Sequence, residues 1–168
     1  DTKLLNAVLM RNKMQNNIVY NKLVDIFGTV NKLNVCIYGL TYKVGTSTLR
    51  RSVAIDIINT LISNGANVKA YDPKVDFEEI IKYKEFDFYD DPYKTIKNGD
   101  VLVIITGWPE LNELDYDEIK LHMRKPIIID TINMLDQSKM IEKGYSYFGI
   151  GRGRKHADYL NAECGDIE

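Results

Sequence analysis

The sequence has little cysteine and no long apolar run, and each shortage excludes a class of protein. Only two cysteines, Cys36 and Cys164, occur among 168 residues, so no framework of disulfides holds this fold together. Because Cys36 lies inside an apolar segment, we expect a reducing compartment and a cytoplasmic protein. No apolar run approaches the ~20 residues that span a bilayer, and the first residues show no signal-peptide pattern. We therefore predict no membrane partner.

A strong excess of charge is also missing. Lysine and arginine number 22 and aspartate and glutamate 24, which gives a formal net charge of −2. This balance provides no bulk attraction to nucleic acid, so we predict no nucleic-acid partner. His156 has no cysteine or carboxylate at the spacing of a metal ligand, and we predict no metal site.

Apolar segments of strand length alternate with helical patterns from residue 34 onward. The predicted strands are 35–38, 68–71, 101–105 and 127–129, with a weaker strand at 86–89 and a last one near 145–150. The predicted helices are 52–64, 77–83, 93–98, 115–123 and 137–143. Near-continuous valine and isoleucine runs between helices indicate a mostly parallel sheet covered on both faces. The predicted fold is α/β, a Rossmann-like three-layer sandwich.

One long N-terminal helix is predicted to precede this sandwich. In residues 1–29 apolar side chains recur at steps of three to five, which is the helical period. The last residues are polar and have no strong period, so we expect them to dock loosely or to be disordered. The predicted organisation is a helix at 1–30, a Rossmann-like domain at 31–153 and a polar tail at 154–168.

The segment Asn34 to Ser52, which reads NVCIYGLTYKVGTSTLRRS, indicates an anion site. A buried strand ends at Gly39, a polar loop with Lys43 follows, and Arg50 stands at the start of a helix. Such a connection presents free N–H groups and a helix dipole to a phosphate at the carboxyl edge of the sheet. Neither common phosphate loop is present, because the chain lacks G-x-G-x-x-G and a G-K-[ST] at Walker spacing. The predicted site belongs to another nucleotide-binding family.

This loop resembles the G-[LF]-[AS]-[FY]-K-x-x-T-x-D-x-R-x-S signature of the UDP-glucose/GDP-mannose dehydrogenase family, where it opens the C-terminal UDP-binding domain. Further segments resemble the family's other motifs in the same order. They are GANVKAYDP at 65–73, TGWPELNEL at 106–114, PIIIDTINML at 126–135 and YFGIGRG at 147–153. An ordered series is far more specific than a single motif, and the chain is identified as a member of this family.

The resemblance implies an NAD-dependent nucleotide-sugar 6-dehydrogenase that oxidises UDP-glucose or a related UDP-hexose to the uronic acid, a precursor of surface polysaccharide. In the family, the catalytic cysteine lies in a G-G-x-C element and NAD binds mainly to a separate N-terminal domain. Neither feature occurs in this chain. Cys36 fits a core position, and Cys164 has no neighbouring base to lower its pKa. We therefore expect no catalytic residue here and no oxidation by the chain alone.

The resemblance also implies ligand contacts for particular residues. Tyr42 and Lys43 match an F-K pair that contacts the UDP-sugar, the aromatic as pocket wall and the lysine as charge. Asp130 and Asn133 match the D-x-R-N element, which contributes to substrate binding. Arg50 matches an arginine that reaches the phosphates of the cofactor across the interdomain cleft, a role that suits a guanidinium fork.

The chain departs from the family pattern in ways that affect binding. Thr48 replaces an aspartate that could orient Arg50, Gly107 replaces the acid before Trp108, and Ile132 replaces the arginine of D-x-R-N. Losing one charge-assisted contact to a phosphate costs roughly 1.5–3 kcal/mol, or about tenfold to a hundredfold in affinity. Either another cation compensates, or the sugar differs, or the chain is a weakly binding or regulatory module.

Structural explanations compete with these functional ones. Lys43 can be a solvated loop residue, and Arg50 can pair with a neighbouring acid in the first turn of the helix. Any of the hydroxyl residues Thr46, Thr48 and Ser52 can be a helix N-cap. For Trp108 we favour packing, and for Asp72 a turn role, because a ribose contact would need a glycine-rich first loop.

The N-terminal helix also has two explanations. Asn12 and Gln15 match an N-x-x-Q element of the family's central dimerisation domain, which predicts a homodimer through this helix. The helix can instead cap the present domain. A chain that serves mainly as an oligomerisation module is a further alternative.

Overall fold

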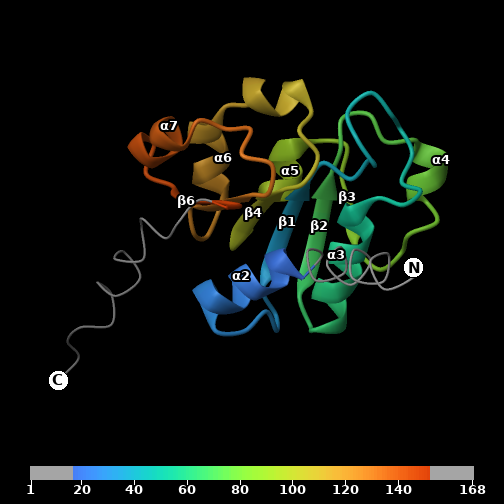
Figure 1. Ribbon diagram of the computed structural model, residues 1–168, viewed down its shortest axis with the longest axis horizontal. Coiled ribbons are helices and arrows are strands. Elements are labelled where there is room, and N and C mark those ends of the chain that lie inside the picture. Colours follow the sequence, from blue (N-terminus) through green and yellow to red (C-terminus); the bar gives the residue numbers. More distant parts are fainter. Residues whose placement is uncertain (1–16, 152–168) are drawn as a thin grey trace, which may run out of the picture.

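The computed structural model describes residues 17–151, which form a six-stranded sheet with helices on both faces (Figure 1). The strands are β1 (Asn34–Tyr38), β2 (Asn67–Tyr71), β3 (Asp87–Phe88), β4 (Val101–Ile104), β5 (Ile127–Asp130) and β6 (Ser146–Gly149). Their order is β3-β2-β1-β4-β5-β6, and all neighbouring pairs are parallel. The predicted Rossmann-like sandwich is confirmed. The strand order reverses between β1 and β4, the point at which such sheets bind ligands.

Five of the six described α-helices begin at a capping side chain. The helices are α2 (Ile18–Phe27), α3 (Val53–Ser63), α4 (Phe77–Ile80), α5 (Pro92–Ile96), α6 (Tyr116–His122) and α7 (Gln137–Glu142), with a 3₁₀ turn η1 at Pro109–Glu113. A serine or aspartate oxygen accepts a backbone N–H at the start of each of α3 to α7. The elements therefore lie where the periodicity predicts them, although most are a few residues shorter.

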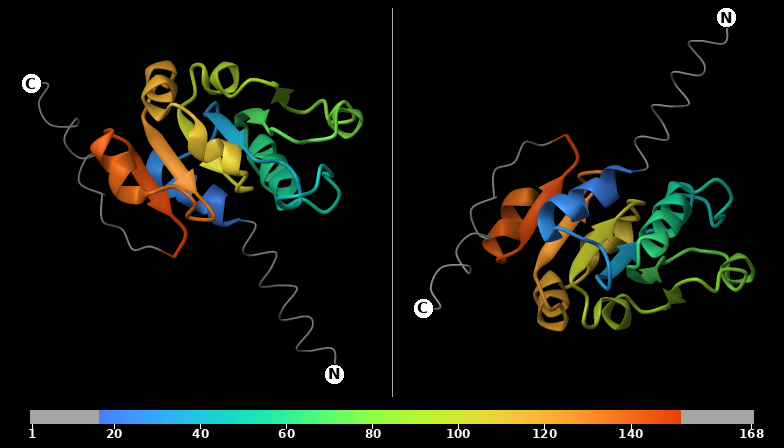
Figure 2. Two further views of the ribbon diagram at one scale, coloured as in Figure 1. Left: turned by 90° about the horizontal axis from the view of Figure 1, so that it is seen from above. Right: turned by 90° about the horizontal axis from the view of Figure 1, so that it is seen from below.

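Helices cover both faces of the sheet, as the views from above and below show (Figure 2), and each face packs a separate core. Val35 and Ile37 of β1 point to the face covered by α2 and α3, whereas Cys36 and Tyr38 point to the face covered by α5, α6 and α7. The Cys36 thiol donates to the carbonyl of Thr95 at 3.2 Å, and burial raises its pKa to about 12. Cys36 is therefore a core residue, as predicted, and not a nucleophile.

Helix α2 packs against the sheet. Val19 and Leu23 have no exposed surface and belong to the core cluster that includes β1 and α3. This part of the predicted N-terminal helix thus caps the present domain. The remainder of that helix, with Asn12 and Gln15, and the predicted tail lie outside the described residues.

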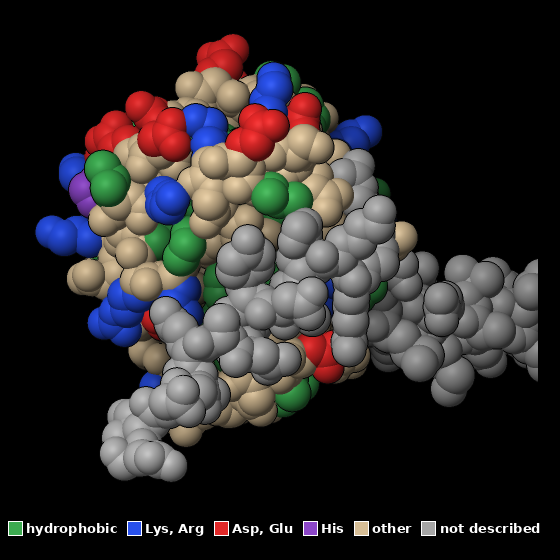
Figure 3. Space-filling view, turned by 90° about the vertical axis from the view of Figure 1, so that its left-hand side faces the viewer, with side chains coloured by type: hydrophobic (Ala, Val, Ile, Leu, Met, Phe, Trp, Pro, Cys, Tyr) green, Lys and Arg blue, Asp and Glu red, His purple; other side chains and the backbone are tan. Residues whose placement is uncertain are grey.

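The surface near α6 and α7 carries charges of both signs side by side (Figure 3). An ion pair between Lys143 and Asp117 joins the two helices there. No helix within residues 17–151 is long and apolar enough to cross a membrane.

Gly39 allows the loop after β1 to cross the loop after β4 at very short range. Its φ is +86°, and a Cβ on this residue would lie 2.4 Å from the carbonyl oxygen and 2.5 Å from the nitrogen of Thr106. Backbone atoms cannot yield as a flexible side chain can, so the crossing requires glycine.

We predict that Gly39→Ala lowers the free energy of unfolding by about 2–4 kcal/mol, because it adds a clash to a left-handed backbone. Gly45→Ala is the control, since Gly45 has a similar φ of +83° but no atom within 4 Å of the added Cβ. We expect this control to cost only about 1–2 kcal/mol. Urea unfolding measures both, and equal losses would contradict the role of the close approach.

Candidate functional site

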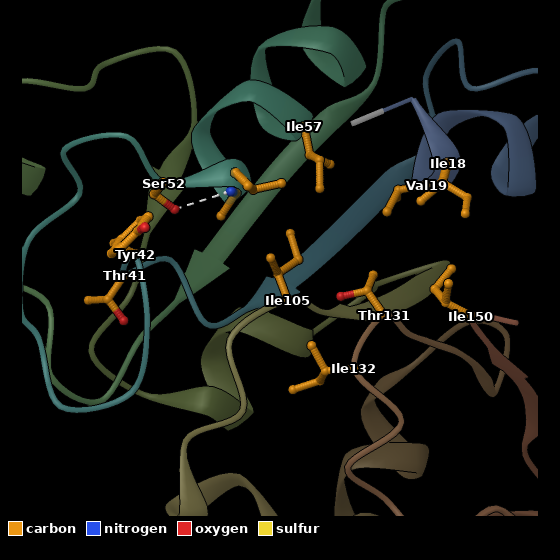
Figure 4. Close-up of a pocket in the computed structure, with 12 residues that line it drawn as sticks. Ile18, Val19, Thr41, Tyr42, Ser52, Ile57, Ile105, Thr131, Ile132 and Ile150 are labelled. Atoms are coloured by element: carbon orange, nitrogen blue, oxygen red, sulfur yellow. Dashed lines mark hydrogen bonds between the residues drawn. The ribbon is translucent and has the colours of Figure 1, made fainter. Parts of the chain in front are cut away.

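A pocket of about 490 Å³ lies at the carboxyl edge of the sheet, beside the point where the strand order reverses (Figure 4). The β1–α3 loop contributes Thr41 and Tyr42 to one side of it. Ile105 and Thr131 follow β4 and β5 at its floor, and Ile18 at the start of α2 lies on the opposite side. Segments that are far apart in the sequence therefore meet at the site that the fold predicts.

No charged side chain among residues 17–151 lines this pocket. Its hydroxyls are largely engaged: Ser52 donates to the carbonyl of Leu40 at 2.5 Å, and Thr131 donates to the carbonyl of Ile104 at 2.9 Å. Ser52 also accepts from the N–H of Ala54, which confirms it as the N-cap of α3 (Figure 4). An unpaired phosphate would be costly in such surroundings. The interior therefore suits an uncharged group, with any anion at the mouth.

Asp72 at the end of β2 organises the start of the β1–α3 loop. One carboxylate oxygen accepts from the N–H groups of Leu40 at 2.7 Å and Thr41 at 2.9 Å, and from the Thr41 hydroxyl at 3.0 Å. The other accepts from the N–H of Lys74 at 2.8 Å. The predicted turn role is therefore confirmed but incomplete, since the same side chain also holds a loop 31 residues away.

These contacts also bear on the cofactor. An acid at the end of β2 binds the ribose in common dinucleotide sites. Here Asp72 is only 4% exposed and its oxygens are occupied by the protein's own donors. The described residues do not fit NAD in that crevice.

Trp108 packs into the core, as predicted, with 6% of its surface exposed. Its indole N–H donates to the Thr41 hydroxyl at 2.9 Å and lies 3.2 Å from the Asp72 carboxylate. The indole thus joins the loop after β4 to the loop after β1. A nearby ion pair between Lys74 and Glu110, at 2.8 Å, adds a further connection. Their hydrogen bond raises the pKa of Lys74 and lowers that of Glu110.

Glu79 of α4 is a second anchor of the same loop, and the sequence analysis missed it. Its carboxylate accepts from the Thr48 hydroxyl at 2.9 and 3.1 Å and from the N–H of Leu49 at 2.5 Å. No spacing rule connects a residue of a four-residue helix with a loop about 30 positions earlier.

The β1–α3 loop carries Tyr42, Lys43 and Arg50 on the outside of the protein. Tyr42 lines the pocket and is 54% exposed. Lys43 and Arg50 are exposed, and neither lines the pocket. Within the described part of the chain, neither forms an ion pair, so both cations remain available to an anion.

Asp130 and Asn133 shape the loop after β5. Asp130 has no exposed surface, and it accepts from the N–H groups of Ile132 and Leu135 and from the Tyr147 hydroxyl. A direct contact between Asp130 and a ligand would require this loop to open. Asn133 has a left-handed φ of 55° and donates to the carbonyl of Ile150, while its buried Oδ1 has no partner among the described residues.

Two departures from the family pattern lie in contact. Ile132 lines the pocket and is 44% exposed. A Cβ added to Gly107 would lie only 2.5 Å from the Cδ1 of Ile132. Where the family pattern has an acid and an arginine, this chain therefore has an apolar contact at the pocket wall. Within residues 17–151 no cluster of histidine, cysteine, aspartate and glutamate could hold a metal ion.

Comparison with known sequences identifies relatives. The family model described as the UDP binding domain of the UDP-glucose/GDP-mannose dehydrogenase family matches residues 36–137. The UDP-glucose 6-dehydrogenase TuaD of Bacillus subtilis is 34% identical over 151 residues, covering 89% of this chain and 33% of that protein. The UDP-glucose 6-dehydrogenase of Pseudomonas aeruginosa is 31% identical over 161 residues, covering 92% and 36%. The chain therefore spans about a third of the length of these curated relatives.

Solved structures share the fold. A UDP-glucose dehydrogenase from Pyrobaculum islandicum superposes with a TM-score of 0.70 at 22% identity, covering 88% of this chain and 32% of that one. A UDP-D-ManNAc dehydrogenase from Pyrococcus horikoshii superposes with a TM-score of 0.64 at 26% identity, covering 84% and 31%.

We predict that Asp72→Asn lowers the free energy of unfolding by about 2–3 kcal/mol, because the amide must direct an N–H toward a buried N–H donor. The variant should also shift the fluorescence of Trp108, the chain's only tryptophan. Asp90→Asn is the control, since Asp90 is exposed. Urea unfolding followed by tryptophan emission measures both, and a similar loss in the two variants would refute the proposed role of Asp72.

Proposed function

The chain belongs to the UDP-glucose/GDP-mannose dehydrogenase family, and on that premise we propose that it binds the UDP-sugar substrate of a nucleotide-sugar 6-dehydrogenase. The proposed reaction of the whole enzyme is the NAD-dependent oxidation of UDP-glucose, or a related UDP-hexose, to the uronic acid. Because the chain spans about a third of its curated relatives, catalysis belongs in this proposal to other parts of the enzyme.

The observation that carries the proposal is the combination of an uncharged pocket with unpaired cations beside it. Tyr42 forms part of the wall, and Lys43 follows it on the same exposed loop. An uncharged part of the nucleotide sugar would enter the pocket, while the diphosphate would remain near Lys43. This division avoids the cost of burying phosphate charge and provides a charge-assisted contact where water still has access.

The catalytic contribution that we propose is positioning. Holding the sugar in line for hydride transfer supplies several kcal/mol of rate enhancement, on the order of that found for oriented intramolecular reactions. The family implies NAD as the hydride acceptor, and we propose that residues outside this chain hold most of it, with Arg50 reaching its phosphates. The buried, protonated thiol of Cys36 favours a reducing, cytoplasmic setting.

A second candidate function is a non-catalytic nucleotide-sugar or regulatory module. The apolar contact of Ile132 with Gly107 favours it, because this contact occupies the place of an arginine that contributes to substrate binding in the family. The same substitution is compatible with an enzyme that accepts a different sugar.

We also propose a homodimer through the helix predicted at residues 1–30. Val19 and Leu23 of α2 already face the sheet, and Asn21 and Asp25 on its outer side are polar and exposed. An apolar contact with a second copy would therefore fall to residues before Ile18. A monomer in sedimentation equilibrium would contradict this assembly, and also the alternative that the chain is mainly an oligomerisation module.

We expect calorimetric titration to detect UDP binding at sub-millimolar strength, with GDP binding more weakly. Lys43→Ala should weaken UDP binding about tenfold, because it removes one charge-assisted contact. Lys84→Ala, a substitution of another exposed lysine, is the matched control and should leave the affinity unchanged. Equal affinity of both variants and the parent chain would place the nucleotide away from this loop.

Ile132→Arg tests the second candidate function. If the site still binds a nucleotide sugar, the added guanidinium should strengthen UDP binding about tenfold, since Ile132 is partly exposed and its replacement can reach solvent. Ile132→Met keeps the position apolar and should have no such effect. An unchanged affinity of the arginine variant would favour a module that no longer binds phosphates at this wall.

A further inference from the structure

We propose that Glu79 is a positioning residue that holds the β1–α3 loop in its ligand-binding form, by supplying the carboxylate that the chain lacks at position 48. The effect that we infer on UDP binding rests on the proposed function. The structural part of the inference can be tested without any ligand.

The contacts of Glu79 converge on one turn of the loop. Its carboxylate accepts from the hydroxyl of Thr48 and from the N–H of Leu49, with distances between 2.5 and 3.1 Å. Leu49 is 2% exposed and belongs to the core beside the sheet. This turn is therefore held both by the packing of the Leu49 side chain and by the carboxylate of Glu79. Without the carboxylate, the half-buried Leu49 N–H would lose its only described acceptor.

Thr48 connects Glu79 with residues that are predicted to contact a ligand. Its hydroxyl accepts from the N–H of Arg50 at 3.1 Å, and its carbonyl accepts from the N–H of Tyr42 at 3.0 Å. Both residues flank the exposed stretch that carries Lys43. One carboxylate on α4 therefore fixes the backbone at both ends of the proposed contact loop.

The loop needs such an anchor for a physical reason. Lys43, Arg50 and Arg51 are all exposed cations on one short segment, and Arg51 has a left-handed φ of 62° that side chains of its kind rarely adopt. A family pattern with aspartate at position 48 would place a carboxylate within this turn itself. In this chain the carboxylate reaches the same turn from Glu79, through the Thr48 hydroxyl. The two arrangements are alternatives, because two carboxylates at this distance would repel each other.

Trypsin provides the ligand-free test, since it cleaves after Lys43, Arg50 and Arg51. In Glu79→Gln the cleavage rate at these bonds should rise about tenfold, because a neutral amide oxygen accepts more weakly than a carboxylate and the NH2 group cannot accept from the Thr48 hydroxyl, so the turn opens more often. Glu78→Gln is the matched control: Glu78 is a neighbouring exposed glutamate of the same helix, and its loss should not change the rate. Mass spectrometry of the fragments separates these bonds from cleavage elsewhere.

A reciprocal substitution separates this role from general destabilisation. Thr48→Asp alone should speed cleavage and weaken UDP binding about tenfold, because its carboxylate faces that of Glu79. In the Glu79→Gln background the same substitution should restore both quantities to within about twofold of the parent chain, since the new carboxylate can accept from the amide at position 79.

The inference is overturned if Glu79→Gln is cleaved no faster than Glu78→Gln, or if Thr48→Asp has the same effect in both backgrounds. If Glu79→Gln does not fold, Thr48→Val removes the hydroxyl that donates to Glu79 and should also speed cleavage. A parent chain that binds no UDP would contradict the proposed function, yet the proteolysis result would still decide the role of Glu79.

Discussion

Carboxylates that accept backbone N–H groups at the carboxyl edge of the sheet are the interaction on which the site depends. Asp72 holds the start of the β1–α3 loop, Glu79 holds its end, and Asp130 holds the loop after β5. Such bonds are stronger than neutral ones because the acceptor is ionised. The loops that surround the pocket are therefore fixed by negative charge that faces inward, while the positive side chains of the β1–α3 loop face outward.

This arrangement explains how a pocket without charged lining can belong to a site for a charged ligand. The carboxylates that hold the loops accept hydrogen bonds from the protein's own donors. The interior of the pocket presents mainly aliphatic surface. Lys43 and Arg50 are exposed on the β1–α3 loop, where in the proposed function they attract an anion. The contact between Gly107 and Ile132 extends the apolar character to the wall, where the family pattern would have placed a cation.

The fold was largely predictable because it depends on local patterns. Runs of valine and isoleucine predict the strands β1 and β4. The capping residue Ser52 predicts the start of α3. Motifs drew attention to Tyr42 and Lys43, which lie on the exposed β1–α3 loop, and their contact with a ligand stays a prediction. Motifs were poor at separating residues that contact a ligand from residues that support the loop. Asp130 lies in a motif, yet it is fully buried in the structure. Glu79 lies in no motif, because its partners are brought to it only by the tertiary fold.

The most direct measurement for the account is an NMR titration of the ¹⁵N-labelled chain with UDP. The account predicts that the largest amide shifts occur at Tyr42, Lys43 and Thr131, around the pocket and its mouth, and that Lys43→Ala reduces them at equal UDP concentration. Shifts confined to another surface of the sheet, or none at millimolar UDP, would contradict a nucleotide site at the β1–α3 loop.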